Sequence, residues 1–176
     1  MDLRVKRTTK SIKDAFFELR KKKSIEKISV KELSELAMIN KATFYLHYKD
    51  IYDLSEKLEE RLINRIISDL RIKGYLRTRK DIYTLNDTLS RAIFSQWEEI
   101  SVLYSGFETN RFIDHLEDRL KEYIFTTFPQ FKNNPEDNII LSFLIQGSYH
   151  AHIRNSGYGE KVLRETTSQM FSRLTN

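Results

Sequence analysis

The spacing of its apolar residues constrains the fold of this chain more than any other feature. Apolar side chains recur at three- and four-residue steps along most of the 176 residues, and the alternation typical of β-strands is scarce. Only five glycines and two prolines interrupt this pattern. Because such a repeat lines up apolar side chains on one face of an α-helix, the sequence predicts an all-α fold of about nine helices.

The first two helices are predicted from their apolar stripes and their capping residues. One helix spans residues 9–22, with Thr8 or Thr9 as the N-cap. The next begins at Ser29, because "SVKE" places Glu32 three residues after a serine. The serine hydroxyl can accept from the Glu32 amide while the Glu32 carboxylate reaches back to the serine amide, an arrangement known as a capping box.

A short third helix and a long fourth helix follow. Asn40 is a favourable N-cap for the short helix, which we expect to end near His47. The long helix is predicted over residues 51–71. Its expected buried stripe has a regular four-residue spacing and consists of Leu54, Leu58, Leu62 and Ile66.

The polar segment "KGYLRTRK" at residues 73–80 predicts a break between an N-terminal and a C-terminal part. Beyond it, Asn134 followed by Pro135 is a strong helix start, since proline is favoured at the first helical position. The glycines of "NSGYG" predict the end of that helix. The helices expected in the C-terminal part span residues 82–100, 110–127, 135–155 and 160–174, with a short segment around residues 102–107 after the first of them.

The excess positive charge of the chain lies entirely in its first 50 residues. Residues 1–50 contain 13 lysines and arginines against 7 aspartates and glutamates, whereas the remaining 126 residues contain 17 against 18. This asymmetry favours a head that binds a polyanion, such as nucleic acid, attached to a nearly neutral body. A solvated lysine-rich face is the alternative explanation.

The second and third predicted helices have the size and spacing of a DNA-reading helix-turn-helix. In such a pair the first helix lies across the DNA backbone and the second enters the major groove. We expect Ile39, Phe44 and Leu46 to be buried and to anchor the second helix. Lys41 and Ala42 fall on the remaining arc, where a lysine can donate to guanine and an alanine can contact a thymine methyl group.

Neighbouring hydroxyls and amines are expected to bind phosphate oxygens. Thr43 and Tyr45 carry hydroxyls on the outer arc. Lys49 precedes the long helix, whose free N-terminal amides form an anion site. The predicted DNA-binding residues are Ser29, Lys31, Asn40, Lys41, Ala42, Thr43, Tyr45, His47, Tyr48 and Lys49.

The stretch "ISVKELSELAMINKATFYLHYKDIYDL" resembles the DNA-binding head of TetR/AcrR-type transcriptional regulators. Thr43, Phe44, Tyr45 and His47 stand at the matching positions of that family's Thr-Phe/Leu-Tyr-x-His-Phe core. The resemblance covers residues 8–60. It implies a three-helix DNA-binding head over residues 1–50, a connecting helix over 51–72, and a helical dimerisation and effector domain over 73–176.

Several positions depart from the family pattern. Met38 replaces the turn glycine, so this position either has an ordinary backbone conformation or carries strain. Ala42 stands where the reading helix often has glycine or proline, and Tyr48 replaces a phenylalanine. Ile51 replaces a lysine at the start of the long helix, and we expect Lys49 to make the phosphate contact in its place.

Surplus apolar surface predicts that the chain forms a dimer. Residues 138–153 are apolar on most sides for nearly four turns, whereas a helix with one buried face needs only a stripe. Together with the last helix, this segment would form a four-helix interface with a second copy. The expected interface residues are Ile140, Phe143, Leu144, Gly147, Ala151, Leu163, Met170 and Phe171.

The resemblance also implies a small-molecule effector. Six aromatic residues of the middle helices are candidates to line its cavity, and an ordinary place in the core is the alternative for each of them. These candidates are Phe94, Trp97, Tyr104, Phe107, Phe112 and Tyr123.

We therefore expect a homodimeric, sequence-specific DNA-binding regulator, acting as a repressor on a palindromic operator, whose affinity an effector modulates. The alternative is a TetR-like adaptor or co-activator that acts mainly through a protein partner. An enzyme is not expected, because the sequence has no cysteine, no glycine-rich phosphate loop and no distinct paired-carboxylate motif.

No metal or other cofactor is expected. His150 and His152 diverge by about 200° on a helix and cannot chelate one ion. The longest nearly continuous apolar run, residues 139–145, is far shorter than the ~20 residues of a membrane span. The first residues lack the apolar stretch of a secretory signal, so we expect a cytoplasmic protein that does not bind membranes.

Overall fold

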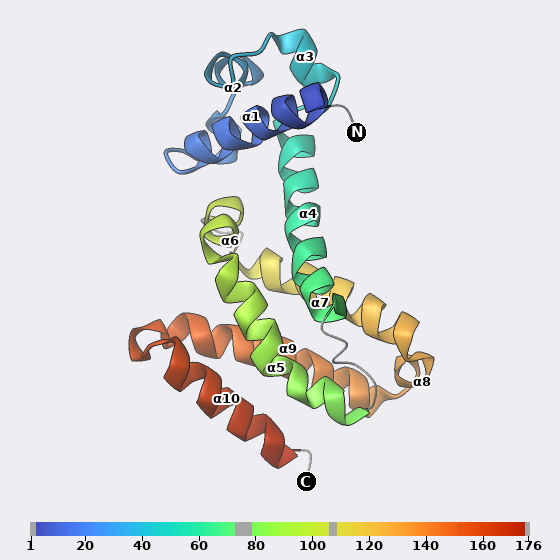
Figure 1. Cartoon of the computed structure of the whole chain (residues 1–176). Helices are drawn as coiled ribbons and strands as arrows, with labels where there is room; N and C mark the ends of the chain where they lie inside the picture. The colour runs from blue at the N-terminus through green and yellow to red at the C-terminus, as the bar shows by residue number, and fades with distance from the viewer. Residues whose placement is uncertain (1–2, 73–78, 106–108, 175–176) are drawn as a thin grey trace. The chain divides into compact units, whose positions relative to one another are not determined.

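Helices form all the regular structure in the described part of the chain. The computed structural model describes residues 3–72, 79–105 and 109–174, and the side chains of all of them except 71–86, 109, 171, 172 and 174 (Figure 1). Within these residues the all-α prediction is confirmed, with ten α-helices, one more than expected. None of the described helices combines the length and apolar character needed to cross a membrane.

The helices follow the predicted order closely. The first five are α1 (Leu3–Arg20), α2 (Val30–Leu36), α3 (Lys41–Tyr45), α4 (Ile51–Ile72) and α5 (Arg79–Ser95). The others are α6 (Trp97–Leu103), α7 (Thr109–Thr127), α8 (Pro129–Lys132), α9 (Pro135–Arg154) and α10 (Glu160–Leu174). Short 3-10 turns occur at Ile25–Lys27 and Ser156–Tyr158.

The chain divides into two compact units. Unit 1 consists of Met1–Leu62 together with Glu98–Glu108, and unit 2 consists of Ile63–Trp97 together with Thr109–Asn176. Most of the predicted polar break, residues 73–78, lies outside the described residues. The three predicted domain ranges therefore stay predictions.

The core of unit 1 forms where the apolar stripes of its helices meet. Phe16 of α1, Leu33 of α2 and Phe44 of α3 are fully buried, and so are Leu54 and Leu58 of α4. Burying an apolar side chain of this size contributes ~1.5–3 kcal/mol. These contacts hold the short helices α2 and α3 in place, because helices of five to seven residues are unstable on their own.

Unit 2 is organised around α9. This helix contacts α5, α7 and α10, and α5 also contacts α10 (Figure 1). The side chain of Asn134 accepts from the amide of Glu136 at 3.0 Å, and Pro135 occupies the first helical position. The predicted start of this helix is therefore confirmed.

The start of α1 was predicted incorrectly. The helix begins at Leu3, six residues before Thr9. The hydroxyls of Thr8 and Thr9 donate to the carbonyl oxygens of Arg4 and Val5, each at 3.0 Å. A threonine inside a helix makes this i to i−4 bond, whereas an N-cap accepts from an amide ahead of it.

The single helix predicted over residues 82–100 is two helices in the structure. α5 ends at Ser95, whose hydroxyl donates to Ala92 O at 2.8 Å. The amide of Gln96 bonds to Ile93 O, three residues earlier, which tightens the last turn. α6 then begins at Trp97, which leaves residues 98–103 free to pack within unit 1.

A network of polar side chains joins α7 to α9. Glu117 forms an ion pair with Lys121 at 2.8 Å and accepts from Ser142 at 2.6 Å and from Gln146 at 2.9 Å. Gln146 also donates to Asp114 at 2.8 Å. Burial raises the pKa of Glu117, but the hydrogen bonds from Lys121, Ser142 and Gln146 outweigh it and bring the pKa below its ordinary value.

Replacing Glu117 by glutamine should make the protein less sensitive to acid. A carboxylate with a lowered folded-state pKa stabilises the fold above its unfolded-state pKa and loses that contribution as the pH falls through the folded value. We expect Glu117→Gln to lower the Tm by about 2–4 °C at neutral pH and to flatten the loss of stability between about pH 5 and pH 3. Thermal unfolding at several pH values measures both effects.

The matched control is Glu165→Gln, which changes an exposed glutamate of α10 that lies 3.9 Å from Lys161. Its pH profile should follow that of the wild type, because an exposed pair contributes little. If Glu117→Gln also gave a parallel profile, the network would not stabilise unit 2.

Candidate nucleic-acid interface

The N-terminus of α2 is capped as predicted, but only in one direction. Ser29 accepts from the amide of Glu32 at 3.2 Å. The Glu32 carboxylate does not complete the capping box and instead accepts from the ammonium of Lys23 at 2.5 Å. Lys23 is therefore neutralised within unit 1, while Ser29 stays exposed at the start of α2.

The cap of α3 uses Asn40 and engages Thr43 twice. The Asn40 side-chain oxygen accepts from the Thr43 amide at 2.7 Å and from the Thr43 hydroxyl at 2.8 Å. Because this hydroxyl has a single proton, Thr43 must release Asn40 before it can donate to a phosphate. The structure thus assigns Thr43 a capping role that the sequence analysis did not include.

Phe44 anchors α3, as predicted, and Leu46 does not. Phe44 is fully buried, and its ring centroid lies 5.6 Å from that of Tyr45 and 5.6 Å from that of Tyr48. Leu46, expected in the core, is 82% exposed. The reason is that α3 ends at Tyr45, so Leu46 occupies the C-cap and points away from the buried face.

The outer arc of α3 carries the predicted reading residues. Lys41, Ala42 and Tyr45 are exposed, and Tyr45 retains 56% of its surface. Lys41 has no ion-pair partner among the described residues, and the same holds for Lys31 and Lys49. By contrast, the lysines at the end of α1 are paired: Lys21 with Glu98, Lys22 with Glu18 and Lys23 with Glu32.

Tyr48 was predicted to contact DNA, but its side chain is buried. It is 3% exposed and packs against Phe44, and the Lys57 ammonium lies 5.3 Å from its ring centroid. A buried ring cannot reach a ligand outside the unit. Tyr48 is therefore a support for α3, whereas the neighbouring His47 is half-buried and its ring centroid is 6.2 Å from that of Tyr48.

Carboxylates occupy one amide in the first turn of α4 and the amide of Lys49 just before it. Asp50 accepts from the amide of Asp53 at 2.8 Å, and the Asp53 carboxylate accepts from the amide of Lys49 at 2.9 Å and from Lys57 at 2.9 Å. The hydrogen bond from Lys57, followed by the one from the Lys49 amide, lowers the pKa of Asp53. The Lys49 amide is therefore not available to a phosphate, and Lys49 can meet one only through its side chain. Ile51 is buried.

Met38 was expected to have either an ordinary or a strained backbone conformation, and the structure has the strained one. Its φ is +54°, in the left-handed region that glycine favours. The amide of Met38 bonds to Glu35 O at 3.2 Å and that of Ile39 bonds to Ser34 O at 3.0 Å. This pair of bonds is the Schellman arrangement that ends a helix, and it requires the left-handed residue here.

Met38→Gly should stabilise the protein by about 0.5–1 kcal/mol. Glycine removes the steric cost of the left-handed conformation, which exceeds the extra backbone entropy that glycine loses on folding. Urea unfolding measures the change. Leu36→Gly is the control: it places glycine at the last residue of α2, where the backbone is helical, and should destabilise by about 1 kcal/mol. A destabilised Met38→Gly would show that the methionine side chain itself stabilises the turn.

Residues 98–105 pack in unit 1 through polar contacts with α1. Lys13 pairs with Glu99 at 2.9 Å, and Lys21 pairs with Glu98 at 2.8 Å. The hydrogen bond between Lys21 and Glu98 raises the pKa of the lysine and lowers that of the glutamate. The guanidinium of the buried Arg20 donates to Leu103 O at 3.3 Å and to the Ser105 hydroxyl at 2.9 Å.

The six candidate effector residues do not form one cavity. Tyr104 is buried in unit 1, and Phe107 lies outside the described residues. Phe112 is core and packs on Tyr149 with ring centroids 5.6 Å apart. The rings of Phe94 and Trp97 lie 6.4 Å apart beside α9.

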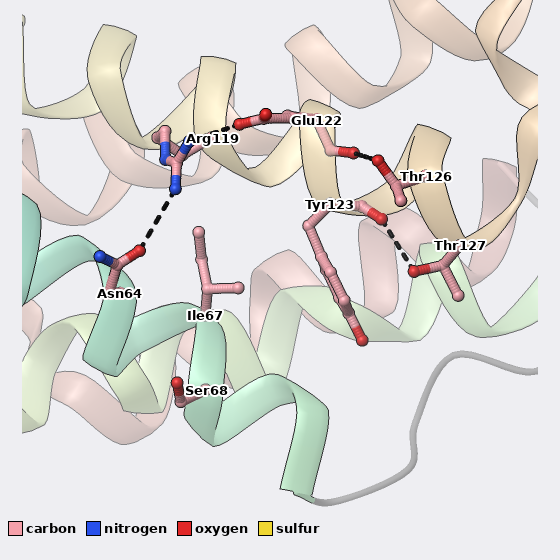
Figure 2. Close-up of a pocket in the computed structure, with 8 residues that line it drawn as sticks. All are labelled: Asn64, Ile67, Ser68, Arg119, Glu122, Tyr123, Thr126 and Thr127. Atoms are coloured by element: carbon pink, nitrogen blue, oxygen red, sulfur yellow. Dashed lines mark hydrogen bonds and ion pairs between the residues drawn. The ribbon is translucent and has the colours of Figure 1, made fainter.

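Tyr123 lines a different space, a polar groove of about 450 Å³ between α4 and α7 (Figure 2). At one end Arg119 donates to the Asn64 side chain at 3.4 Å and pairs with Glu122. At the other end Thr127 donates to the carbonyl oxygen of Tyr123. The groove therefore contains one balanced ion pair and several hydroxyls. Within the described residues, no three acidic or histidine side chains converge as a metal site.

The predicted dimer residues divide between surface and core. Phe143 (58% exposed) and Gly147 of α9 are exposed, as is Met170 of α10, whereas Leu144 and Leu163 are buried inside unit 2. Ile140 and Ala151 are half-buried, and the side chain of Phe171 is outside the described part. An apolar groove of about 370 Å³ runs between the two helices, lined by Phe143, Gly147, Ser148, Ala151, Thr167, Met170 and Arg173.

A scan against protein-family models finds no match to this chain, and a search of curated proteins finds none either. The function is therefore argued from the residues and their geometry.

Proposed function

We propose that this protein is a TetR-like transcriptional regulator that binds a palindromic DNA operator as a homodimer. The observation that carries the proposal is the outer face of α3. Lys41, Ala42 and Tyr45 are exposed there, while Phe44 on the opposite side is fully buried. A short helix fixed by one buried aromatic and presenting a free lysine, a small residue and a hydroxyl suits the major groove.

Each exposed residue has a separate task in this proposal. Lys41 donates to guanine in the major groove, and Ala42 allows close approach to the bases and contacts a thymine methyl group. Tyr45 donates its hydroxyl to a phosphate, and the unpaired Lys31 and Lys49 neutralise phosphates on either side. The paired lysines at the end of α1 stay outside the interface.

The dimer is supported by the exposed apolar face of α9 and α10. Ile139, Phe143 and Met170 are exposed there, and an apolar groove lies between the helices. A two-fold axis through this face would bring four helices together and produce two reading helices. Such helices must lie ~34–36 Å apart to occupy successive major grooves. A small-molecule effector would then act by changing that separation.

The first test is the salt dependence of DNA binding. A selection from random DNA supplies the probe, and the affinity of the wild type should fall steeply with salt. Tyr45→Ala should weaken binding by about tenfold, since it removes a phosphate contact and part of the helix surface. The control Tyr158→Ala changes a tyrosine of unit 2 that is even more exposed, and this variant should bind DNA as the wild type does.

The proposal is abandoned if the purified protein retains no DNA of any sequence at low salt. If DNA binds but Tyr45→Ala and Tyr158→Ala are both without effect, another surface binds the DNA.

A second candidate is an adaptor or co-activator that acts through a protein partner. Three exposed apolar side chains favour it: Leu36, Met38 and Leu46 lie on or beside α2 and α3, where a purely DNA-binding surface would have polar groups. Capture of one defined protein without DNA, and loss of that capture in Leu46→Lys, would support this function.

A further inference from the structure

His152 of α9 carries a buried hydrogen-bond acceptor without a partner. The residue is 3% exposed. Its Nδ1 lies 2.7 Å from Ser148 O, one turn earlier on the same helix. A carbonyl oxygen can only accept, so Nδ1 holds the proton and Nε2 of the neutral ring is an acceptor. Nε2 is buried and has no hydrogen-bond partner among the described residues.

His152 lines a small, partly open space between α5 and α9. The ring of Phe94 lies 5.1 Å from the ring of His152 and 6.4 Å from that of Trp97. The free volume is about 10 Å³, close to the least that holds one water molecule. Among the described side chains, none that lines it is an aspartate, glutamate, lysine or arginine. The lining consists of Leu89, Ser90, Ile93, Phe94, Trp97, Ile145, Ser148, Tyr149, His152 and Ile153.

A water molecule suits this space poorly. Buried water normally makes about three hydrogen bonds, and seven of the ten lining residues offer apolar or aromatic surface. A molecule with one donor and an otherwise apolar body would satisfy Nε2 of His152 and also fill the apolar part. The acceptor nitrogen of His152 therefore indicates that a ligand of this space would carry one hydrogen-bond donor.

The walls of the space differ in how firmly they are held. Leu89, Ile93 and Ile145 are buried and form a fixed floor. Phe94 and Trp97 are half-buried, so their rings can turn outward without leaving a packed core. The space can thus enlarge on the side of these two aromatic residues.

We propose that this space is a binding site for a small, neutral aromatic molecule with a single hydroxyl or N–H donor, such as a phenol or an indole. Nε2 of His152 accepts from that donor, and Phe94 and Trp97 contact the aromatic ring of the ligand. The inference rests on the effector part of the proposed function and refines it, because it names one site and one class of ligand. Sequence reasoning selected Phe94 and Trp97 for such a site but not His152.

The test uses phenol and toluene, which have similar shapes and differ in one donor. Trp97 is the only tryptophan of the chain, so its fluorescence reports on this site. The wild type should bind phenol saturably and about tenfold more tightly than toluene. In His152→Leu this preference should disappear. The control His150→Leu changes a neighbouring histidine that diverges from His152 by about 200° on the helix, and it should keep the preference.

A second measurement needs no variant. In protein labelled with ¹⁵N at histidine, phenol should shift the Nε2 resonance of His152 and toluene should leave it unchanged. Equal affinity of the wild type for both compounds, an unshifted Nε2 resonance or no saturable binding would overturn the proposal, and the last result would indicate a bound water only. None of these measurements uses DNA, so a failure of the DNA-binding proposal leaves the test intact.

Discussion

In the proposed homodimer, Phe143→Asp should separate the two copies and lower the affinity for a palindromic operator by at least about 100-fold. Phe143 is 58% exposed and lines the apolar groove between α9 and α10. An aspartate there would have to lose its hydration when a second copy covers the groove, and Arg173 is the one cation among the described residues that line it. A monomer binds one half-site only and loses the avidity of two linked heads.

Analytical ultracentrifugation and DNA titration measure the two effects separately. Tyr158→Asp is the matched control, because it adds the same charge at an exposed aromatic residue of unit 2 that does not line the groove. If the Phe143→Asp protein stays dimeric, the dimer interface does not lie at this groove. A variant that is monomeric but binds the operator normally would show that DNA recognition does not need two heads.

Arg20→Ala should destabilise the protein by about 2–4 kcal/mol. The Arg20 side chain is buried and donates to Leu103 O and to the Ser105 hydroxyl, and also to Lys23 O at 3.4 Å. Alanine removes the donor from the carbonyl oxygen of Leu103, which is fully buried. A buried hydrogen-bonding group that loses its partner costs much more than an exposed one.

Urea unfolding measures the loss, with Lys22→Ala as the control. Lys22 is an exposed residue of the same segment, paired with Glu18 at 3.2 Å, so its removal should change stability by no more than about 0.5 kcal/mol. Arg20→Lys should fall between the two, because it keeps the charge but loses the branched donor group. Equal stability of Arg20→Ala and the wild type would mean that residues 98–105 are held without this arginine.

The elements that sequence predicted well depend on local chemistry. Asn40 and Asn134 were identified as N-caps because an amide side chain bonds to amides two or three residues ahead, whatever surrounds it. The buried stripe of α4 followed from its spacing alone. Thr9 was placed wrongly because a threonine can accept as a cap or donate to i−4, and only the residues before it decide which.

The candidate site was harder to predict where it depends on helix ends or distant partners. Leu46 and Tyr48 lie just after α3, where one residue of difference in the helix end reverses which side chain is buried. Arg20 contacts residues 83 and 85 positions away, which no local pattern reports. The sequence indicates the burial of Arg20 only through its position, four residues after Phe16 on the buried face of α1.

Aromatic residues illustrate the same limit in unit 2. Phe112 and Phe94 both follow the apolar period of their helices, yet one is a packed core residue and the other lies at a half-buried wall. Periodicity gives the face of a helix but not the space in front of it. The sequence could not predict that Nε2 of His152 is an unpaired acceptor, because this follows from the hydrogen bond of Nδ1 to Ser148 O.

The contacts of residues 98–105 with α1 restrict how this protein could be recombined. A unit 1 cut after α4 would lack Glu98, Glu99 and Leu103, and so would remove the contacts that these residues make with Lys21, Lys13 and Arg20. A single recombination event that exchanged only the N-terminal segment of unit 1 between two related chains would remove the same contacts. To keep these contacts, a transferred unit 1 has to include two separate segments of sequence, residues 1–62 and 98–108.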